Sequence, residues 1–515
     1  MPENCDVGHS TSRSVCLQAH VRSILAEHYR VGGHMPPLQR RQFLQQSAVL
    51  GATAMLGPVG GASAIGIDYD VIIIGAGMSG MTAARLLAEM GPGIKVLVLD
   101  ARDRVGGRMY TSADDVSPHG VELGAQAVWG SSAETLELVK KYGMQTRSTE
   151  HFGETRYLYY RDGVAPQPLD EARQKEFMSE LLKAYQSYQG PDISLAEFAA
   201  GQGFSDENLL AAAAAQWAAG AGELSVHAAL GDGEAWRDYR DEDLILFGGY
   251  SRLAKKMAAD LSGKIRLESV VTDILWGEEL CGVIYKDRGI ESAVTSRRVI
   301  VTLPVGVLHS GDVAFKPPLP KAKQRALDGL GMGQAVVLPM LFDEPFWRDT
   351  IPYPGGLKRL DEQVSFTIPH DNKRGGNAIN GYFTADAAQQ MSELGEEAAL
   401  KQALSWLEQA TGVSGLEDKL SWHAFADWVT DPYSYGCYSI TRPGGHGLRE
   451  EFAKPVGKTL FFAGEATAPA PHYQSVHGAY ASGKRVAGEV AASMGLSDRL
   501  PGDEGTAEDA VIELL

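Results

Sequence analysis

The clearest pattern of hydrophobic positions lies in DYDVIIIGAGMSGMTAARLLAEMGPGIKVLVLDAR, residues 68–102. Residues 71–74 form an unbroken β-branched run, which predicts a buried parallel strand because a strand covered on both faces is apolar at every position. An alanine- and leucine-rich helix is expected to follow and to end near Gly91. A second apolar strand, residues 95–99, then leads to Asp100. This order predicts a strand–helix–strand unit of a parallel sheet.

Apolar strand-like segments return much later in the chain, at residues 263–274, 299–303 and 458–468. Helical patterns dominate residues 150–245, and a last helix is expected over residues 477–494. Elements of one domain therefore occur at the start, middle and end of the chain. A second domain must then be built from insertions.

The predicted fold is α/β, with a Rossmann-like dinucleotide-binding domain and an inserted α+β domain that binds substrate. The first domain is expected to comprise residues 65–150, 245–305 and 455–495, and the second residues 151–244 and 306–454.

Three glycines follow the first strand and open the predicted helix. Gly75 permits a tight turn, Gly77 lets a pyrophosphate approach the backbone, and Gly80 lets helix and strand pack closely. The helix N-terminus offers free N–H groups to phosphates. Asp100, twenty residues beyond Gly80, can accept hydrogen bonds from ribose hydroxyls. The glycine spacing alone is weak evidence, but this context predicts a dinucleotide site.

Residues 1–64 are expected to be a leader. Within them MPPLQRRQFLQQSAVLGATAMLGPVGGASA, residues 35–64, has paired arginines, a weakly apolar run and a small-residue end, the order of an export signal. The Arg40 and Arg41 pair resembles a twin-arginine signal, with Met35 as an alternative translation start. The expected location is periplasmic or otherwise extracytoplasmic, in a bacterium. The alternative is a membrane anchor, but the run is short and glycine-rich, so no stable span is expected.

Composition adds limits on the partners. The chain is 44% hydrophobic and 22% charged, which is ordinary for a soluble globular protein. A formal net charge of -18 argues against a nucleic-acid partner and is compatible with attracting cationic small molecules. His423, His472 and His477 lack metal-ligand spacing with cysteines, so no metal site is expected. The acidic tail, residues 496–515, is expected to be flexible.

Four further motifs occur in a fixed order: ARDRVGGRMYT (101–111), VELGAQAVWG (121–130), FGGYSRLAKKMA (247–258) and FFAGEATAPAPHYQSVHGAYASGKRVAG (461–488). With the glycine turn they resemble the flavin-containing amine oxidase family, which includes monoamine oxidases, polyamine oxidases and related histone demethylases. The resemblance covers roughly residues 68–495. It implies that the dinucleotide is FAD, so the first domain is FAD-binding, and that the substrate is a small-molecule amine.

The resemblance also assigns cofactor contacts to residues that match the family motifs. The implied contacts are Arg102, Gly107 and Arg108 along the FAD, Val271 at the adenine, Gly464 and Glu465 at the ribityl chain, and Ser475 and Val476 near the isoalloxazine ring.

The implied reaction is oxidation of a primary or secondary amine to an imine, with hydride transfer to flavin N5 and hydrolysis by water. The protein positions the C–H bond and desolvates the nitrogen, so no acid–base triad is required. In monoamine oxidases two aromatic side chains flank the amine: Tyr438 matches one, whereas Ser475 stands at the other. Trp129 stands where polyamine oxidases tend to have an acidic or histidine residue, so a smaller or aromatic amine fits at least as well.

The sequence also departs from the family at the position of a lysine, and this leaves the identity of the electron acceptor open. Family members usually carry a lysine that holds a water at flavin N5 and assists reaction with oxygen. Counting from Gly331 in LGMGQAVVLPMLFDEPFW, or back from EPFW, places Val337 at that position. Oxygen is the first expectation for the acceptor, and a redox protein such as a cytochrome, or a quinone, is the alternative.

Three interpretations of Cys437, in the segment YGCY, remain open. It is a small buried hydrophobe, half of a disulfide with Cys281 in an oxidising compartment, or a covalent flavin ligand. In monoamine oxidases the matching cysteine bonds to the flavin 8α-methyl group. Polyamine oxidases usually have serine there and bind FAD non-covalently.

Other functions on the same fold also remain open. An L-amino-acid oxidase needs an arginine for the substrate carboxylate, and the sequence does not identify one. An amine dehydrogenase would pass electrons to a cytochrome or quinone. A non-catalytic flavoprotein subunit would bind FAD without substrate-dependent bleaching. A homodimer is compatible with each of these functions.

Overall fold

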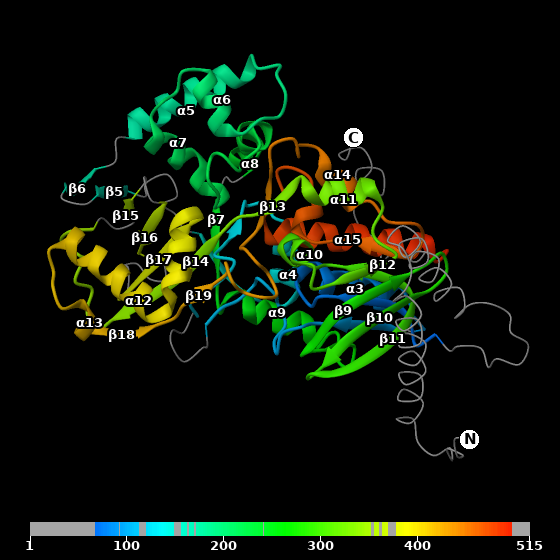
Figure 1. The fold of residues 1–515 in the computed structure, drawn as a ribbon. Coiled ribbons are helices and arrows are strands. Elements are labelled where there is room, and N and C mark those ends of the chain that lie inside the picture. Colours follow the sequence, from blue (N-terminus) through cyan, green and yellow to red (C-terminus); the bar gives the residue numbers. More distant parts are fainter. Residues whose placement is uncertain are drawn as a thin grey trace, which may run out of the picture.

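The computed structural model describes residues 67–496, except 92, 113–119, 149–155, 162–163, 169–170, 240–241, 352–354, 360–362 and 369–376. The predicted leader, and the acidic tail beyond residue 496, lie outside the described residues. The described chain forms two large sheets side by side, and a group of helices stands beside them (Figure 1).

The first sheet has the strand order β12, β9, β10, β11, β1, β2 and β8, with β21 also paired to β11. Its strands are β1 (Tyr69–Ile74), β2 (Val96–Leu99), β8 (Ile265–Arg266), β9 (Ser269–Trp276), β10 (Cys281–Asp287), β11 (Ile290–Val301), β12 (Ala314–Lys316) and β21 (Leu460–Phe462). Strands β1, β2, β8 and β21 run parallel to one another and to β11. Strands β9, β10 and β11 form an antiparallel meander. This is the predicted Rossmann-like sheet.

Strand β1 is apolar at successive positions because both faces of the sheet are covered. Val71 and Ile73 belong to one buried cluster, whereas Ile72 and Ile74 belong to another on the opposite face. The first cluster includes residues of α3 (Met78–Met90), α9 (Gly249–Ala259) and α15 (Val476–Ser493). The second includes residues of α10 (Val305–Ser310), α11 (Lys321–Asp328) and α14 (Leu448–Ala453).

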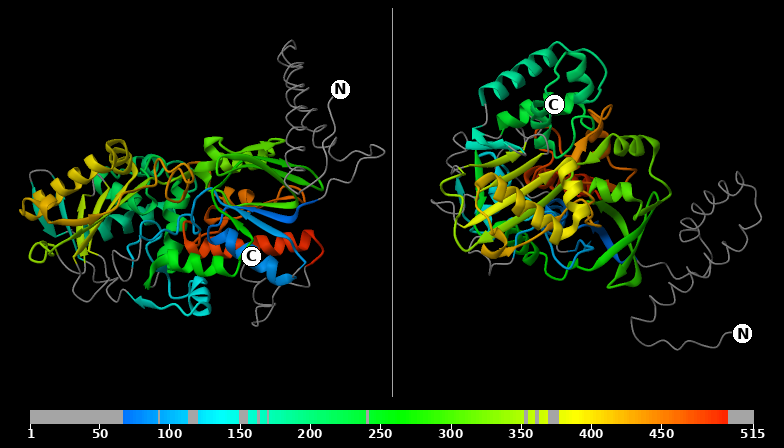
Figure 2. Two further views of the ribbon diagram at one scale, coloured as in Figure 1. Left: turned by 90° about the horizontal axis from the view of Figure 1, so that it is seen from below. Right: turned by 60° about the vertical axis from the view of Figure 1, so that its left-hand side comes forward.

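The second sheet has the strand order β18, β14, β17, β16, β15, β5 and β6, with β19 also paired to β14. Its strands are β5 (Arg156–Arg161), β6 (Val164–Pro168), β14 (Ala335–Phe342), β15 (Gly355–Arg359), β16 (Val364–Thr367), β17 (Ala378–Thr384), β18 (Leu420–His423) and β19 (Ala426–Asp427). The long helix α12 (Ala385–Thr411) covers one face, followed by the short α13 (Leu416–Lys419) (Figures 1 and 2). Val336, Leu338 and Met340 of β14 pack with α12, so the alternate residues of that strand face the other way.

The remaining elements join the two sheets. The helical group consists of α5 (Glu171–Gln186), α6 (Leu195–Gly201), α7 (Glu207–Ala214), the turn η2 (Ala215–Trp217), the π-helix η3 (His227–Asp232) and α8 (Gly233–Tyr239). A three-stranded sheet contains β3 (Val128–Trp129), β7 (Asp243–Leu246) and β4 (Thr146–Ser148), beside α4 (Thr135–Lys141). Strands β13 (Leu330–Met332) and β20 (Ser439–Thr441) form a pair, and η4 (Glu465–Thr467) precedes α15.

The elements expected from hydrophobic patterns are confirmed within a few residues, including α3, β2, β9, β21 and α15. Strand β12 lies past residue 305 and pairs with β9 of the first sheet. The division of the chain into domains by residue number stays a prediction.

Candidate functional site

One cavity of about 1130 Å³ runs between the carboxyl ends of the first sheet and the uncovered face of the second. This is where ligands bind in open α/β sheets. The predicted site residues that line it are Gly75, Gly77, Asp100, Arg102, Gly107, Arg108, Trp129, Val271, Cys437, Tyr438, Gly464, Glu465, Ser475 and Val476. Gly80 is the predicted site residue that does not line the cavity.

The glycine turn has the shape that its sequence predicts. Gly75 has φ +110°, and a Cβ there would lie 2.4 Å from Thr302 Oγ1. A Cβ on Gly80 would lie 2.0 Å from the backbone oxygen of Gly75, so only glycine allows α3 to pack this closely on the turn. At Gly77, by contrast, the nearest atom to an added Cβ would be 4.0 Å away. Its backbone is therefore open toward the cavity.

The Asp100 side chain is hydrogen-bonded to backbone groups of the glycine turn and of its own loop. Its carboxylate accepts hydrogen bonds from the backbone N–H groups of Ala76, at 2.6 Å, and Arg102, at 2.9 Å. Burial raises the pKa of this carboxyl above its ordinary value, although the two N–H groups oppose the shift. The side chain thus fixes the glycine turn against the next loop, and its predicted contact with ribose hydroxyls would use its remaining lone pairs.

Arg102 is held at the edge of the cavity by a segment far away in the sequence. Its guanidinium makes two hydrogen bonds with the carboxylate of Asp431, at 2.8 and 2.7 Å. It also lies over the ring of Tyr433, 5.4 Å from the centroid. Arg102 therefore connects the first sheet to the loop that leads to Cys437.

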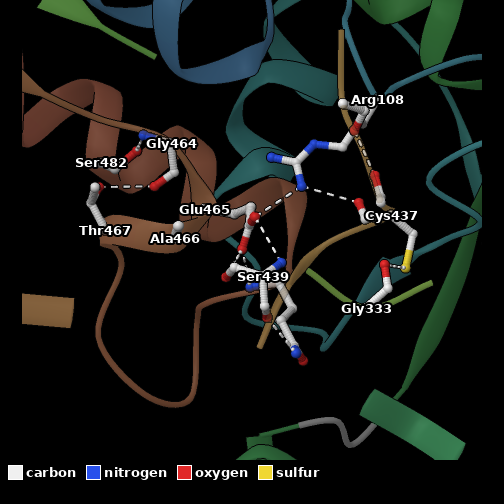
Figure 3. Close-up of polar contacts among 12 residues, drawn as sticks. Arg108, Gly333, Cys437, Ser439, Gly464, Glu465, Ala466, Thr467 and Ser482 are labelled. Atoms are coloured by element: carbon white, nitrogen blue, oxygen red, sulfur yellow. Dashed lines mark hydrogen bonds and ion pairs between the residues drawn. The ribbon is translucent and has the colours of Figure 1, made fainter. Parts of the chain in front are cut away.

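Glu465 is the centre of a buried polar network (Figure 3). Its Oε1 accepts from Arg108 Nη1, at 2.9 Å, and from the backbone N–H of Ser439, at 3.1 Å. Its Oε2 accepts from Ser439 Oγ, at 2.7 Å, and from the backbone N–H of Gln474, at 3.0 Å. Burial would raise the pKa of this carboxyl, but the charges of Arg108 and Arg449 outweigh it and hold the pKa below its ordinary value. Glu465 is therefore a buried carboxylate anion.

Cys437 lies next to this network. Arg108 Nη1 donates to its backbone oxygen at 3.0 Å, and its Sγ lies 3.2 Å from the backbone oxygen of Gly333. Burial raises the pKa of the thiol to about 12, so it is protonated at neutral pH. Cys281 lies in β10 and is also free, with its Sγ 3.7 Å from the oxygen of Thr459. The disulfide between the two cysteines is absent from the structure.

Two tyrosines meet at the end of the cavity beside Cys437. The Tyr438 hydroxyl donates to the backbone oxygen of Gln216 at 3.0 Å and is also hydrogen-bonded with Tyr382 of β17. Burial raises the pKa of both phenols, so both stay neutral. Val337 of β14 lies directly opposite Tyr382 and also lines the cavity.

Ser475 has a structural role that accounts for the missing aromatic residue. It is the N-cap of α15, where its Oγ accepts from the backbone N–H of Gly478 at 2.9 Å. The same hydroxyl donates to the backbone oxygen of His472. A serine at this position satisfies an otherwise free N–H group of the helix, which a tyrosine would not do.

Trp129 forms part of a second aromatic wall. Its ring packs edge-to-face on Trp236 of α8, with 5.2 Å between centroids. Asp243 lies opposite Trp129 in the pairing of β3 with β7, and Arg147 lies opposite Ile245 of the same strand. All five side chains line the cavity.

Comparison with known proteins identifies the family. The family model described as "Flavin containing amine oxidoreductase" matches residues 78–491. The chain belongs to this family. The predicted resemblance and the predicted enzyme class are therefore confirmed.

Similar proteins of this family are known from plants and bacteria. The chain is 29% identical to lysine-specific histone demethylase 1 homolog 2 of Arabidopsis thaliana over 82% of its own length and 59% of the demethylase. It is 29% identical to polyamine oxidase 4 of Oryza sativa subsp. japonica, over 82% of this chain and 88% of that protein. The chain thus spans little more than half the length of the demethylase and most of the oxidase.

Solved structures show the same fold. Wild-type putrescine oxidase bound to putrescine superposes with a TM-score of 0.69 at 22% identity, covering 82% of this chain and 99% of that one. Cyclohexylamine oxidase from Brevibacterium oxydans IH-35A superposes with a TM-score of 0.68 at 20% identity, covering 83% and 100%. The predicted fold class is confirmed.

The residues of this flavin-family chain fit FAD. Gly77 is the N-cap of α3, so no side chain there competes for the first N–H groups of the helix, which suit a pyrophosphate. Arg108, Gly464 and Val271 of β9 border the same cavity. Among the described residues, no three His, Cys, Asp or Glu side chains form a metal-binding group. None of the described helices is long and apolar enough to cross a membrane.

Several cavity residues were missed by the sequence reasoning. Tyr382 and Asn380 lie on β17, and Trp236 lies on α8, in segments without a recognisable family motif. The alternation along β17 could have indicated that residues 380 and 382 share a face. It could not have indicated that this face borders the cavity.

Proposed function

We propose that the chain oxidises a primary or secondary amine to an imine, which water then hydrolyses. The observation that carries this proposal is one continuous cavity that runs from the glycine turn to an aromatic chamber around Tyr438, Tyr382 and Trp129. FAD, when bound, accepts the hydride that leaves the carbon beside the nitrogen. The relatives named for putrescine, cyclohexylamine and polyamines support an amine substrate.

The side chains of the chamber provide the conditions that the reaction needs. The two tyrosines are neutral, so the reacting nitrogen meets no fixed charge from them. Aromatic and aliphatic walls exclude water, which favours the neutral amine over the ammonium ion. Deprotonation is required because only the neutral amine has a lone pair that assists loss of hydride.

The primary test is an anaerobic panel of amines read by bleaching of the flavin absorption. Phenethylamine, cyclohexylamine and putrescine are expected to bleach the flavin, and leucine is not. Reoxidation is then followed with oxygen and with cytochrome c. If neither amines nor amino acids bleach the bound flavin, the chain has no amine-oxidising function and this proposal fails.

The electron acceptor depends on Val337. An aliphatic side chain here cannot hold a water by hydrogen bonding, which supports slow reoxidation by oxygen. We infer that oxygen is the acceptor and that it reoxidises the flavin slowly. Faster reoxidation by cytochrome c or a soluble quinone than by oxygen would favour the alternative, an amine dehydrogenase.

We also propose that Cys437 forms a thioether with the flavin. The position of Cys437 in the lining of the cavity supports the proposal. The bond would replace the thiol S–H and one C–H of the flavin 8α-methyl group, and the two electrons released would reduce the flavin ring, which the electron acceptor of the reaction would then reoxidise. The thiol has a raised pKa and must lose its proton as the bond forms. Acid precipitation decides between the alternatives: a yellow pellet indicates the covalent bond, and a yellow supernatant indicates free FAD. Cys437→Ser is the control, and its FAD is expected to be released.

A second candidate function is oxidation of an amino acid. It is favoured by Arg147, which lines the cavity on the same small sheet as Trp129 and could bind a carboxylate. Bleaching by leucine that is faster than by phenethylamine, and that is lost in Arg147→Met, would favour this function over amine oxidation.

For the location, we propose export through the twin-arginine route. The support is the Arg40 and Arg41 pair ahead of a weakly apolar run. Replacing both arginines by lysine in the full chain is expected to retain the protein in the cytoplasm. Unchanged appearance in the periplasmic fraction would contradict the proposal.

A further inference from the structure

One polar side chain on the second sheet has an unused hydrogen-bond acceptor. Asn380 of β17 lies between Pro339 of β14 and Thr367 of β16, and it lines the cavity. It is 8% exposed, and its Oδ1 has no hydrogen-bond partner among the described residues. Leaving a buried acceptor unpaired costs free energy. A ligand that donates to this oxygen therefore recovers that cost.

The orientation of the Asn380 amide is fixed by its neighbour Gln126. The Nε2 of Gln126 lies 3.1 Å from the backbone oxygen of Gly124 and 3.3 Å from that of Glu122. Both oxygens only accept, so the nitrogen of Gln126 must face them and its Oε1 must face Asn380. Asn380 Nδ2 then donates to Gln126 Oε1, at 3.3 Å. Asn380 Oδ1 is left pointing away from Gln126 as an acceptor.

The position of Asn380 relative to the tyrosines sets the distance from the reacting end. Tyr382 follows Asn380 by two residues on the same face of β17, opposite Val337, and is hydrogen-bonded with Tyr438. Two residues along a strand span about 6.5–7 Å. That distance corresponds to an extended chain of roughly five bonds, the number between the two donor atoms at the ends of a four-carbon chain.

We propose that Asn380 Oδ1 accepts a hydrogen bond from a second donor group of the substrate, an amino or hydroxyl group about four carbons from the oxidised amine. Asn380 is then a specificity-determining residue, and Gln126 is a positioning residue that acts through it. The inference rests on the proposed amine oxidation. A carboxamide oxygen accepts from a neutral hydroxyl as well as from an ammonium group, so the second group needs no charge.

The experiment compares kcat/KM for three amines of equal chain length: butylamine, its hydroxyl-terminated analogue and putrescine. The wild-type enzyme is expected to prefer both two-donor substrates over butylamine by about tenfold, the value of one hydrogen bond near 1.4 kcal/mol. Asn380→Leu has similar volume and no acceptor, so the preference is expected to disappear. Gln126→Leu is expected to reduce it. Ser421→Ala, at an exposed position on β18 of the same sheet, is expected to leave the ratio unchanged.

A second variant keeps the test decisive if Asn380→Leu loses its flavin. Asn380→Asp is expected to favour putrescine over the hydroxyl-terminated amine by about tenfold, because a carboxylate bonds an ammonium group more strongly than a hydroxyl. The inference is wrong, and the proposed function stands, if amines bleach the wild-type flavin without a two-donor preference, if that preference survives in Asn380→Leu, or if Asn380→Asp does not shift the ratio toward putrescine. If no amine bleaches the flavin, both fail.

Discussion

At the scale of single residues, Glu465 joins parts of the chain that are far apart in sequence. Its partner Arg108 is 357 positions away, and Ser439 is 26 positions away. Arg449, itself buried, donates to the same Ser439 hydroxyl at 2.6 Å. The anion therefore compensates two cations that would otherwise be buried beside the cavity without a negative partner.

Glu465→Gln is expected to destabilise the enzyme by about 3–5 kcal/mol, because removing one member of a buried ion pair leaves the other charge uncompensated. The measurement is urea denaturation together with FAD retention on gel filtration. Glu450→Gln is the matched control, because Glu450 is exposed on α14. Equal stability of the two variants would show that the network contributes little.

At the same scale, Val337→Lys tests whether residue 337 controls the reaction of the reduced flavin with oxygen. The new ammonium group would extend from β14 into the cavity and could hold a water there, so reoxidation by oxygen is expected to accelerate by about tenfold. Stopped-flow mixing of the reduced enzyme with oxygen measures the rate, and Val337→Met controls for the added volume. An equal acceleration in Val337→Met would exclude a role for the charge.

At the scale of elements, the approach of α3 to the glycine turn decides whether the dinucleotide-type site can form. The helix begins at Met78, and Gly80 on its first turn touches the backbone of Gly75. Close packing also joins α3 to α15, where a Cβ on Gly483 would lie 2.6 Å from the oxygen of Ser79. These contacts allow no side chain larger than hydrogen.

Gly80→Ala is therefore expected to displace α3 and to reduce the FAD content of the purified protein several-fold. Gly488→Ala on α15 is the control, because a Cβ there would have no atom within 4 Å. That substitution is expected to stabilise the helix by about 0.5–1 kcal/mol. Flavin absorbance per protein and the thermal midpoint measure both effects, and full FAD occupancy in Gly80→Ala would refute the packing argument.

At the scale of the whole molecule, Glu122 makes stability depend on pH. Its carboxyl accepts from Thr111 Oγ1, at 2.7 Å, and from the backbone N–H of Tyr250, at 2.9 Å. Burial raises its pKa from 4.5 to about 8. Between these values the unfolded chain has released the proton and the folded chain has kept it, so stability falls as the pH rises.

Glu122→Gln removes this titration. As the pH rises through this interval, the free energy of unfolding of the wild-type holoenzyme is expected to fall by about 1–2 kcal/mol more than that of the variant. The difference is smaller than the full pKa shift implies, because Glu122 also borders the cavity and solvent there screens its charge. Urea midpoints measured at both ends of the interval test the difference. Parallel pH profiles of the two proteins would show that Glu122 is ionised throughout.

Much of the fold was predictable because its signals are local. The apolar run before Gly75, the glycine spacing and the following strand reflect the geometry of neighbouring residues, and each is found where the sequence placed it. Motifs matched residue by residue gave the candidate site positions, and the structure brings all of them except Gly80 to one cavity.

The sequence by itself thus determined the Rossmann-like unit, the family and the residues of the dinucleotide-type turn, because strand, turn and helix preferences act over a few residues. Only the tertiary structure decided that Tyr382 meets Tyr438 and that Asn380 keeps a free acceptor at the cavity wall. Those facts depend on contacts between segments tens to hundreds of residues apart. No local sequence pattern indicates which face of β17 meets those distant segments.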